Sequence, residues 1–117
     1  MATLETFERG EDIFRSATLY IDDTPADTAD FVTIELEVRH KYSKVVLALF
    51  AMAAGTIDTP APTTSGIITW IIERQDNTDD VQTGIYEYEV TTTELDADYL
   101  AGTRYRKFIG DCFILNP

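Results

Sequence analysis

Apolar and polar residues alternate along several stretches of this chain, which is the pattern of β-strands that have one buried face. The most regular stretch covers residues 84–90, where three residues point one way and three the other: Tyr86, Tyr88 and Val90 against Ile85, Glu87 and Glu89. A period of two with aromatic and β-branched residues favours a strand. We therefore expect residues 84–90 to form the central strand, with the tyrosines in the core.

The same alternation predicts further strands. Residues 32–39 place one set toward the core and the other toward water: Val32, Ile34, Leu36 and Val38 against Thr33, Glu35, Glu37 and Arg39. Strands are also expected at residues 11–21, 67–74 and 103–109, and residues 112–115 close the sheet after a bulge at Gly110. Residues 67–74, with Ile68, Trp70 and Ile72 on one face, are apolar on both faces, which predicts the middle of a sheet or a covered face.

Residues 45–54 form the longest apolar run, ten residues without a charge. A membrane-spanning helix needs about 20 such residues, so this run is expected inside the fold and no membrane is expected as a partner. A strand that pairs with residues 32–39 is favoured by Val45, Val46 and the short connection. A helix that begins at Ser43 and ends at Gly55 is the alternative.

The segments between these strands carry turn signals. Residues 22–30, 55–66 and 75–82 are rich in Pro, Asp, Asn and Thr, and residues 91–102 are expected to form a turn or one short helical turn with Tyr99 and Leu100 packed beneath it. Residues 1–9 form an N-terminal arm that either pairs along a sheet edge or reaches a neighbour. About seven strands in residues 10–117 predict a single domain of the all-β class, an immunoglobulin-like antiparallel β-sandwich.

The net charge of the chain limits the kinds of partner it can bind. The 117 residues contain 21 acidic and 9 basic side chains, a formal charge of −12. Because nucleic-acid binding depends on neutralising phosphates with Lys and Arg, this field opposes it and favours basic protein surfaces. A single cysteine is typical of a protein made in a reducing compartment.

No catalytic constellation is recognisable. His40 is the only histidine, and we expect it to be solvated at a strand end. Cys112 lies among Phe113, Ile114 and Leu115, where a cysteine is normally a small core residue with an unreactive thiol. Zinc sites need several His and Cys ligands. We therefore expect a protein that is not an enzyme and has no cofactor.

Calcium and carbohydrate binding form the rival hypothesis. Oxygen ligands for calcium are offered by Asp76, Asp79 and Asp80, or by a second acidic group in residues 22–30, but neither has the order of an EF-hand loop. The favoured interpretation is that these side chains bond to their own backbone. Among the aromatic residues, Tyr42 and Tyr99 are the best surface candidates for a sugar platform.

Most of the basic residues fall in two short patches. The first follows the strand at residues 32–39, and the second lies on the late strand: Arg39, Lys41 and Lys44, with His40; and Arg104, Arg106 and Lys107. One hypothesis is head-to-tail docking on an acidic face of another copy or partner, which predicts association that weakens with salt. The alternative is that these residues pair with carboxylates of the same chain.

Three segments together resemble the small immunoglobulin-like domains of tailed-phage virion proteins, in particular the N-terminal domain of baseplate upper proteins. They are Phe7-Glu8-Arg9-Gly10-Glu11-Asp12, the strand from Ile34 to His40, and Gly84-Ile85-Tyr86-Glu87-Tyr88-Glu89-Val90 followed by a strand that ends near Gly110. The resemblance covers nearly the whole chain. It implies a structural or adaptor role in the tail, baseplate, neck or capsid of a virion, with other virion proteins or copies of itself as partners. It transfers no catalytic residue.

Overall fold

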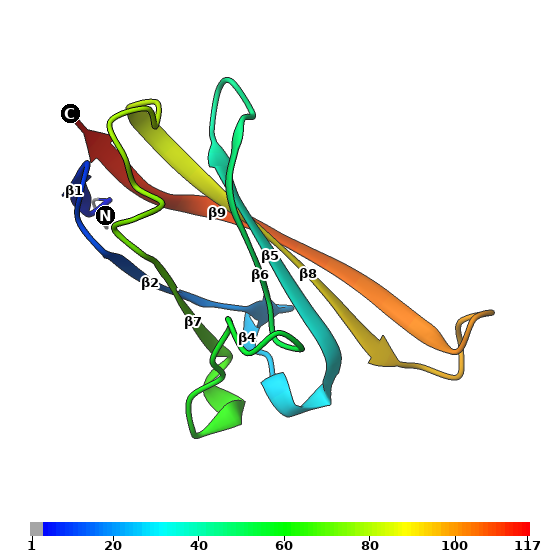
Figure 1. Ribbon diagram of the computed structural model, residues 1–117. Coiled ribbons are helices and arrows are strands. Elements are labelled where there is room, and N and C mark those ends of the chain that lie inside the picture. Colours follow the sequence, from blue (N-terminus) through cyan, green and yellow to red (C-terminus); the bar gives the residue numbers. More distant parts are fainter. Residues whose placement is uncertain (1–3) are drawn as a thin grey trace.

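The computed structural model describes residues 4–117 and consists mainly of β-strands, so the predicted all-β class is confirmed (Figure 1). In chain order the strands are β1 (Thr6–Glu8), β2 (Ile13–Thr18), β3 (Tyr20–Ile21), β4 (Thr24–Pro25), β5 (Phe31–His40), β6 (Val46–Ala51), β7 (Ile67–Ile72), β8 (Gly84–Leu95) and β9 (Thr103–Asn116). Two short 3-10 helices, η1 (Thr28–Asp30) and η2 (Thr63–Ser65), lie in the connections.

The strands form one large sheet and two small ones. The large sheet has the order β1-β9-β8-β5-β6, β2 pairs with β7, and β3 pairs with β4. The large sheet curves, and β2 and β7 cross its inner face (Figure 1). The ring centroids of Trp70 on β7 and Tyr88 on β8 lie 5.8 Å apart, so the two sheets meet through their side chains. The core therefore lies between a five-stranded sheet and a two-stranded sheet.

The alternation in the sequence accounts for this core. Ile34, Leu36 and Val38 of β5 are buried, and so are Tyr86 and Val90 of β8. From the opposite layer come Ile13, Ala17, Ile68, Trp70 and Ile72. β8 lies in the middle of the large sheet, as expected for the central strand. Residues 46–51 form strand β6, paired antiparallel with β5, so the strand prediction is confirmed and the helix alternative is wrong.

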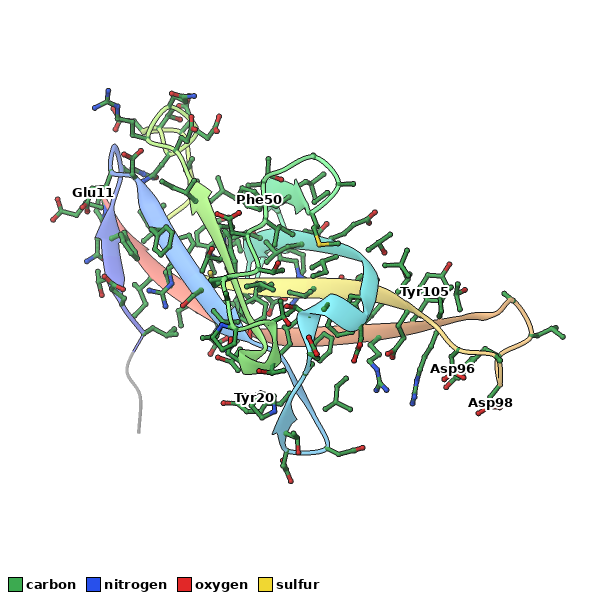
Figure 2. The ribbon with its side chains drawn as sticks, turned by 90° about the horizontal axis from the view of Figure 1, so that it is seen from below. Glu11, Tyr20, Phe50, Asp96, Asp98 and Tyr105 are labelled. Atoms are coloured by element: carbon green, nitrogen blue, oxygen red, sulfur yellow. The ribbon has the colours of Figure 1, made fainter. Side chains whose placement is uncertain are left out.

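The turn expected at residues 91–102 begins later than predicted. β8 continues to Leu95 and pairs with β9 along its whole length, from Gly84 opposite Leu115 to Leu95 opposite Thr103. The run of β-branched threonines, residues 91–93, keeps the backbone extended. The turn therefore projects beyond the other strands as a hairpin arm, residues 95–103 (Figure 2). The expected packing of Tyr99 and Leu100 beneath a turn is wrong, because both are exposed.

Three register shifts interrupt the large sheet: one makes Leu47 an extra residue of β6, and the other two are β-bulges in β5 and β9. The register between β5 and β8 shifts between Phe31 and Thr33, so Val32 is an extra residue and its side chain is 53% exposed, while Phe31 is buried. The prediction of Val32 as a core residue is therefore wrong. In β9 the extra residue is Cys112, opposite the step from Tyr86 to Glu87. This places the bulge at Cys112 and not at Gly110.

Gly110 has a different reason to be glycine. It pairs regularly with Tyr88, and a Cβ at Gly110 would lie 2.6 Å from the hydroxyl oxygen of Tyr88 and 2.8 Å from its ring carbon Cζ. The tyrosine ring thus lies across Gly110, which leaves no room for a side chain. The glycine in this strand marks a close side-chain approach.

The two ends of the chain described by the structure lie together at one sheet edge. β1 pairs in parallel with the last residues of β9, from Thr6 opposite Ile114 to Glu8 opposite Asn116. The N-terminal arm thus pairs along an edge over these residues, while residues 1–3 lie outside the described part of the chain. For β7 the expectation was the middle of a sheet or a covered face. The first alternative is wrong, because β7 belongs to a two-stranded sheet with β2 and meets only an isolated bridge, Asp58 to Thr69, on its other side in residues 4–117; the second fails at Ile71, which is exposed.

Candidate functional site

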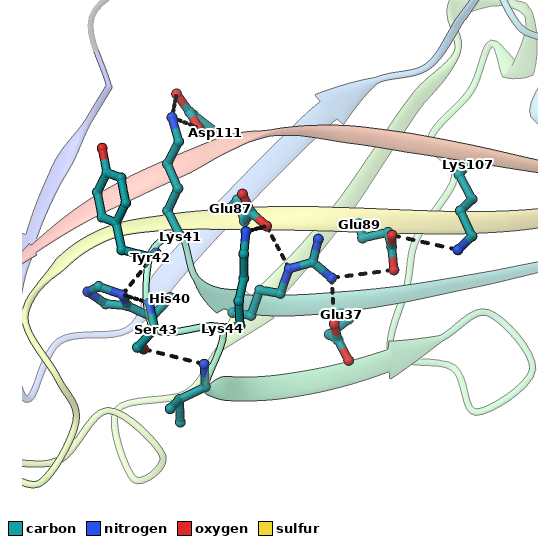
Figure 3. A network of polar contacts seen from close by, with 12 residues as sticks. Glu37, His40, Lys41, Tyr42, Ser43, Lys44, Glu87, Glu89, Lys107 and Asp111 are labelled. Carbon is teal, nitrogen blue, oxygen red and sulfur yellow. Dashed lines mark hydrogen bonds and ion pairs between the residues drawn. The ribbon is translucent and has the colours of Figure 1, made fainter.

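The first basic patch lies on the outer face of the large sheet, where β5, β8 and β9 run side by side (Figure 3). Arg39 faces Glu87 across β5 and β8, and Nε of Arg39 donates to a Glu87 carboxylate oxygen at 2.6 Å. Nη1 of Arg39 also donates to Glu37 at 2.9 Å and to Glu89 at 3.5 Å. One guanidinium therefore connects three carboxylates on two strands.

Glu87 is the centre of this network. Its side chain is buried, and Nζ of Lys44 binds the same carboxylate oxygen at 3.1 Å. Burial would raise the pKa of Glu87, but the hydrogen bonds from Arg39 and Lys44 outweigh it and hold the pKa below its ordinary value. The hydrogen bonds to Glu87 and Glu37 raise the pKa of Arg39. Glu87 lies on the face opposite the tyrosines, as the alternation predicts, but Arg39 and Lys44 cover it.

Lys41 binds a third strand. Its Nζ lies 2.9 Å from Oδ1 of Asp111 on β9, and the hydrogen bond to Asp111 raises the pKa of Lys41. Both side chains are partly exposed, so this pair contributes little to stability. The pair links the β5–β6 turn to β9, which is separated from β5 by β8 in the sheet.

The second basic patch lies at the base of the arm and on β9. Nε of Arg106 is 2.7 Å from Oε1 of Glu94, and Nη1 of Arg104 is 3.9 Å from Oδ2 of Asp96. Nζ of Lys107 lies 3.9 Å from Oε1 of Glu89, which joins this patch to the first one. The two patches predicted from the sequence are therefore connected through Glu89.

All six basic residues named from the sequence have a carboxylate of the same chain within 4.0 Å: Arg39, Lys41, Lys44, Arg104, Arg106 and Lys107. This is the arrangement that the internal-pairing alternative describes. Docking of these residues on a neighbouring acidic face stays a prediction, and it requires that at least some of these pairs be exchanged for intermolecular ones.

His40 is not solvated, so that expectation is wrong. The ring is buried, and its Nδ1 accepts hydrogen bonds from the backbone N–H of Tyr42 at 3.3 Å and of Ser43 at 3.1 Å. Nε2 lies 3.1 Å from the carbonyl oxygen of Thr83. With Nδ1 as acceptor, Nε2 carries the proton and donates to Thr83. Both nitrogens are thus used to hold the β5–β6 turn against the start of β8.

Cys112 is buried as expected, and burial raises the pKa of its thiol to about 12 from an ordinary 9.0. Since the thiolate is the nucleophile, a raised pKa makes the thiol unreactive. We predict that native protein at pH 8 reacts with iodoacetamide at least ~100-fold more slowly than protein unfolded in guanidinium, because both access and ionisation are blocked. Equal rates in the two states, measured by mass spectrometry, would contradict this placement of Cys112.

A groove of about 420 Å³ crosses the outer face beside the first patch. It is lined by acidic and small apolar side chains of β5, β6, β8 and the turn after β6, among them Glu35, Glu37, Glu89, Leu49, Ala51, Ala54 and Thr56. Glu37 and Glu89 already bind Arg39, so they are engaged in the network. The groove therefore presents a contact surface that is bordered by acidic side chains.

Within residues 4–117 no three His, Cys, Asp or Glu side chains are grouped so as to hold a metal ion. Asp76, Asp79 and Asp80 are exposed in the connection between β7 and β8. Their neighbour Asn77 is buried, and its Nδ2 donates to the carbonyl oxygens of Glu8 and Glu11, both at 3.0 Å. The side-chain amide of Asn77 therefore holds the connection between β7 and β8 against the turn that follows β1.

The aromatic surface candidates lie far apart. Tyr42 and Tyr99 are both exposed, but Tyr42 follows the end of β5 that pairs with Tyr86, while Tyr99 lies in the arm beyond the other end of β8. A sugar platform needs neighbouring rings, which these two do not provide. Trp70, Tyr86 and Tyr88 belong to the core side of their strands, as predicted.

The comparisons with known proteins add no relative. No family model, no curated protein and no solved structure matches this chain. None of the helices in residues 4–117 is long and apolar enough to cross a membrane.

Proposed function

We propose that this chain is a non-enzymatic structural or adaptor component of a tailed-phage virion, which acts through protein–protein contacts. Its partners are other virion proteins or copies of itself, in the tail, baseplate, neck or capsid. The proposal rests on the sequence resemblance and on the surfaces of the folded chain. It assigns the function to exposed edges and an arm, and it requires no reaction centre.

The observation that carries this proposal is the hairpin arm. Leu95 is 78% exposed and Leu100 is fully exposed, at the end of a molecule whose principal extents are 48 × 28 × 25 Å. Asp96 and Asp98 lie at the same tip (Figure 2). Clustered large apolar side chains on the surface of a protein mark contact sites, because burying them in a partner is favourable. An arm of this kind suits insertion into a neighbouring subunit.

The ion-paired sheet supports the same role. Arg39, Lys44 and Lys107 bind carboxylates from neighbouring strands, so the outer face of the sheet is fixed in one arrangement. A rigid sheet holds the arm in a constant direction, which a repeated assembly contact needs. With both nitrogens of His40 engaged and the Cys112 thiol buried, the two most versatile catalytic residue types serve the fold.

We also infer that the two facing sheets form an immunoglobulin-like arrangement. The order β9-β8-β5-β6 matches the sheet G-F-C-C′ of a variable-type domain, and β2 with β7 matches strands B and E. The hydroxyl of Tyr86, near the start of β8, donates to the carbonyl oxygen of Gln82 at 2.6 Å, as a tyrosine corner does. An experimental structure in which β2 and β7 join the large sheet would contradict this inference.

Quantitative mass spectrometry of purified particles tests the virion proposal. Particles are purified from the phage or prophage that encodes the chain, and its amount is compared with that of the major capsid and tail proteins. We expect the chain at a constant ratio to one of them in repeated preparations. Its absence from particles, or genes for polysaccharide degradation beside its own in place of portal, capsid or tail genes, would contradict the proposal.

A further inference from the structure

β6 is an edge strand of unusual composition. Among the residues that the structure describes it pairs with β5 on one side only, and residues 45–54 contain no charged residue and no proline. Val45, Val46 and Leu49 are exposed, with Leu49 72% exposed. Edge strands of soluble proteins usually carry charges or other features that prevent pairing with a further strand. This edge has one such feature, a bulge at Leu47 where the register with β5 shifts between Val38 and Arg39, but it has neither charge nor proline.

The backbone groups on the outer side of β6 follow from its pairing. The N–H of Met52 donates to the carbonyl oxygen of Ile34 at 2.9 Å, and in an antiparallel ladder every second residue makes such bonds. Phe50 and Ala48, opposite Leu36 and Val38, therefore turn their groups toward β5. Because N–H and C=O of one peptide point in opposite directions, both groups of Leu49 and the C=O of Leu47 point to the free edge.

Thr56 closes one end of this edge. Its Oγ1 accepts from the N–H of Ala51 at 2.8 Å, and its own N–H donates to the carbonyl oxygen of Ala51 at 3.2 Å. Ala51 is thus bonded on its outer side as if a neighbouring strand were present. The open part is limited to the segment from Leu47 to Leu49, whose outward groups have no hydrogen-bond partner shown in residues 4–117.

The opposite side of the sheet differs. The last residues of β9 are covered by β1, and the uncovered part of β9 carries Arg104, Arg106 and Lys107. Positive charges along an edge disfavour the addition of another strand. Of the two edges of the large sheet, the β6 edge is therefore the one that is open to pairing with another strand.

We propose that β6 pairs antiparallel with β6 of a second copy of this chain. The N–H of Leu49 in each copy donates to the C=O of Leu47 in the other, so one two-fold axis at Ala48 pairs two of the three open groups of each copy. The exposed Leu49 side chain then lies beside β6 of the other copy and is covered at the same time. The result is a closed dimer with one continuous sheet.

Charge supports a second copy as the occupant. The chain carries −12, so two copies repel each other over most of their surface, but the uncharged β6 avoids like charges at the contact itself. In this register the Lys44 end of each β6 lies beside the Glu35 end of the other sheet, since Glu35 is opposite Ala51. Glu35 is exposed and has no ion pair within residues 4–117, so it can accept Lys44 of the other copy, in exchange for the 3.1 Å contact of Lys44 with Glu87 of its own chain.

This dimer does not depend on the proposed virion function, because it forms between copies of the isolated chain. Failure of the dimer would leave the virion proposal standing, and absence of the chain from particles would leave the dimer standing. The dimer also differs from docking through the basic patches in its response to salt. Screening weakens attraction between opposite charges, but it relieves the repulsion between two acidic copies.

Sedimentation velocity over a range of concentrations tests the proposal with two matched variants. Leu49→Lys places a charge at the free edge, while Ile109→Lys makes the same change on β9, at a residue 61% exposed on the same outer face. We expect Leu49→Lys to raise the dimer dissociation constant at least ~10-fold and Ile109→Lys to change it less than about twofold. We expect the wild-type dimer to tighten between about 0.05 M and about 0.5 M NaCl.

Hydrogen exchange provides a second readout. The amide of Leu49 should exchange more slowly at concentrations where the dimer forms, with little change at β9. A wild-type chain that stays monomeric at roughly 0.5 mM in high salt overturns the proposal. So does a dimer that Leu49→Lys leaves intact, and so does association that weakens as salt rises, which would instead assign the contact to the basic patches.

Discussion

Replacing Gly66 with alanine should lower the free energy of unfolding by roughly 2–4 kcal/mol. Gly66 follows η2 with a φ of +72°, a left-handed conformation that costs a residue with a Cβ about 1 kcal/mol. The added Cβ would also lie 2.7 Å from the carbonyl oxygen of Leu19 and 3.1 Å from the backbone N and O of Ala26. These are backbone atoms, so no side-chain rotation removes the clash.

Gly55 provides the matched control for this substitution. Its φ is +75°, but nothing lies within 4 Å of a Cβ placed there. Gly55→Ala should therefore cost only the conformational part, about 1 kcal/mol. Urea unfolding followed by tryptophan fluorescence measures both variants. Equal losses would show that the contact between Gly66, Leu19 and Ala26 is not as tight as described.

Replacing Arg39 with methionine should lower the free energy of unfolding by about 1–3 kcal/mol at neutral pH, because Glu37, Glu87 and Glu89 lose the guanidinium they share. The loss is smaller than for a fully buried ion pair, since the network borders solvent. Lys44 still binds Glu87 in the variant, which also limits the loss.

The stability lost in Arg39→Met should depend on pH. The folded-state pKa of Glu87 is lowered, so its stabilising contribution is present above the unfolded-state pKa and is lost as pH falls through the folded-state pKa. The gap between wild type and Arg39→Met should therefore narrow as pH falls below about 4. Arg74→Met, a change at an exposed arginine outside this network, should leave stability nearly unaltered. A gap that is independent of pH would contradict the role given to Glu87.

Periodicity predicted the parts of the fold that depend on local pattern. Ile34, Leu36 and Val38 alternate with polar residues, and they are buried because the strand has one wet and one dry face. A bulge breaks this rule with no local signal. Val32 has the right parity for the core, and only the extra residue relative to β8 turns it outward. Register is a property of two strands, so one strand's sequence does not reveal it.

The candidate site shows the same limit. Sequence position grouped Arg39, Lys41 and Lys44, but it could not supply their partners, because Glu87 and Asp111 lie on strands far along the chain. His40 next to a lysine at a strand end is typical of a solvated residue. Its burial depends on Gly84, where a Cβ would lie 2.8 Å from Nε2, so the missing side chain makes room for the ring. Gly84 is visible in the sequence, but its effect on His40 depends on a tertiary contact between residues far apart in the chain.

The length of the hairpin was also underestimated from the sequence. The acidic residues of 94–98 indicated a turn. Asp96 and Asp98 do lie at the tip, but Glu94 belongs to β8, because the threonines before it continue the strand to Leu95. Local turn signals fix where a turn is centred better than where it begins. The functional proposal depends on this difference, because the longer hairpin is what extends Leu95 and Leu100 beyond the rest of the sheet.

The central claim is that the chain works by inserting this arm into a neighbour in a particle, and a competition for incorporation tests it most directly. Wild type and the variant Leu95→Ser/Leu100→Ser are produced together, and quantitative mass spectrometry compares their ratio in purified particles with their ratio in the host lysate. With folding of the variant verified by circular dichroism, we expect it to be depleted at least ~10-fold in particles, since these exposed leucines supply the buried anchor. Equal ratios in particles and lysate would contradict the claim.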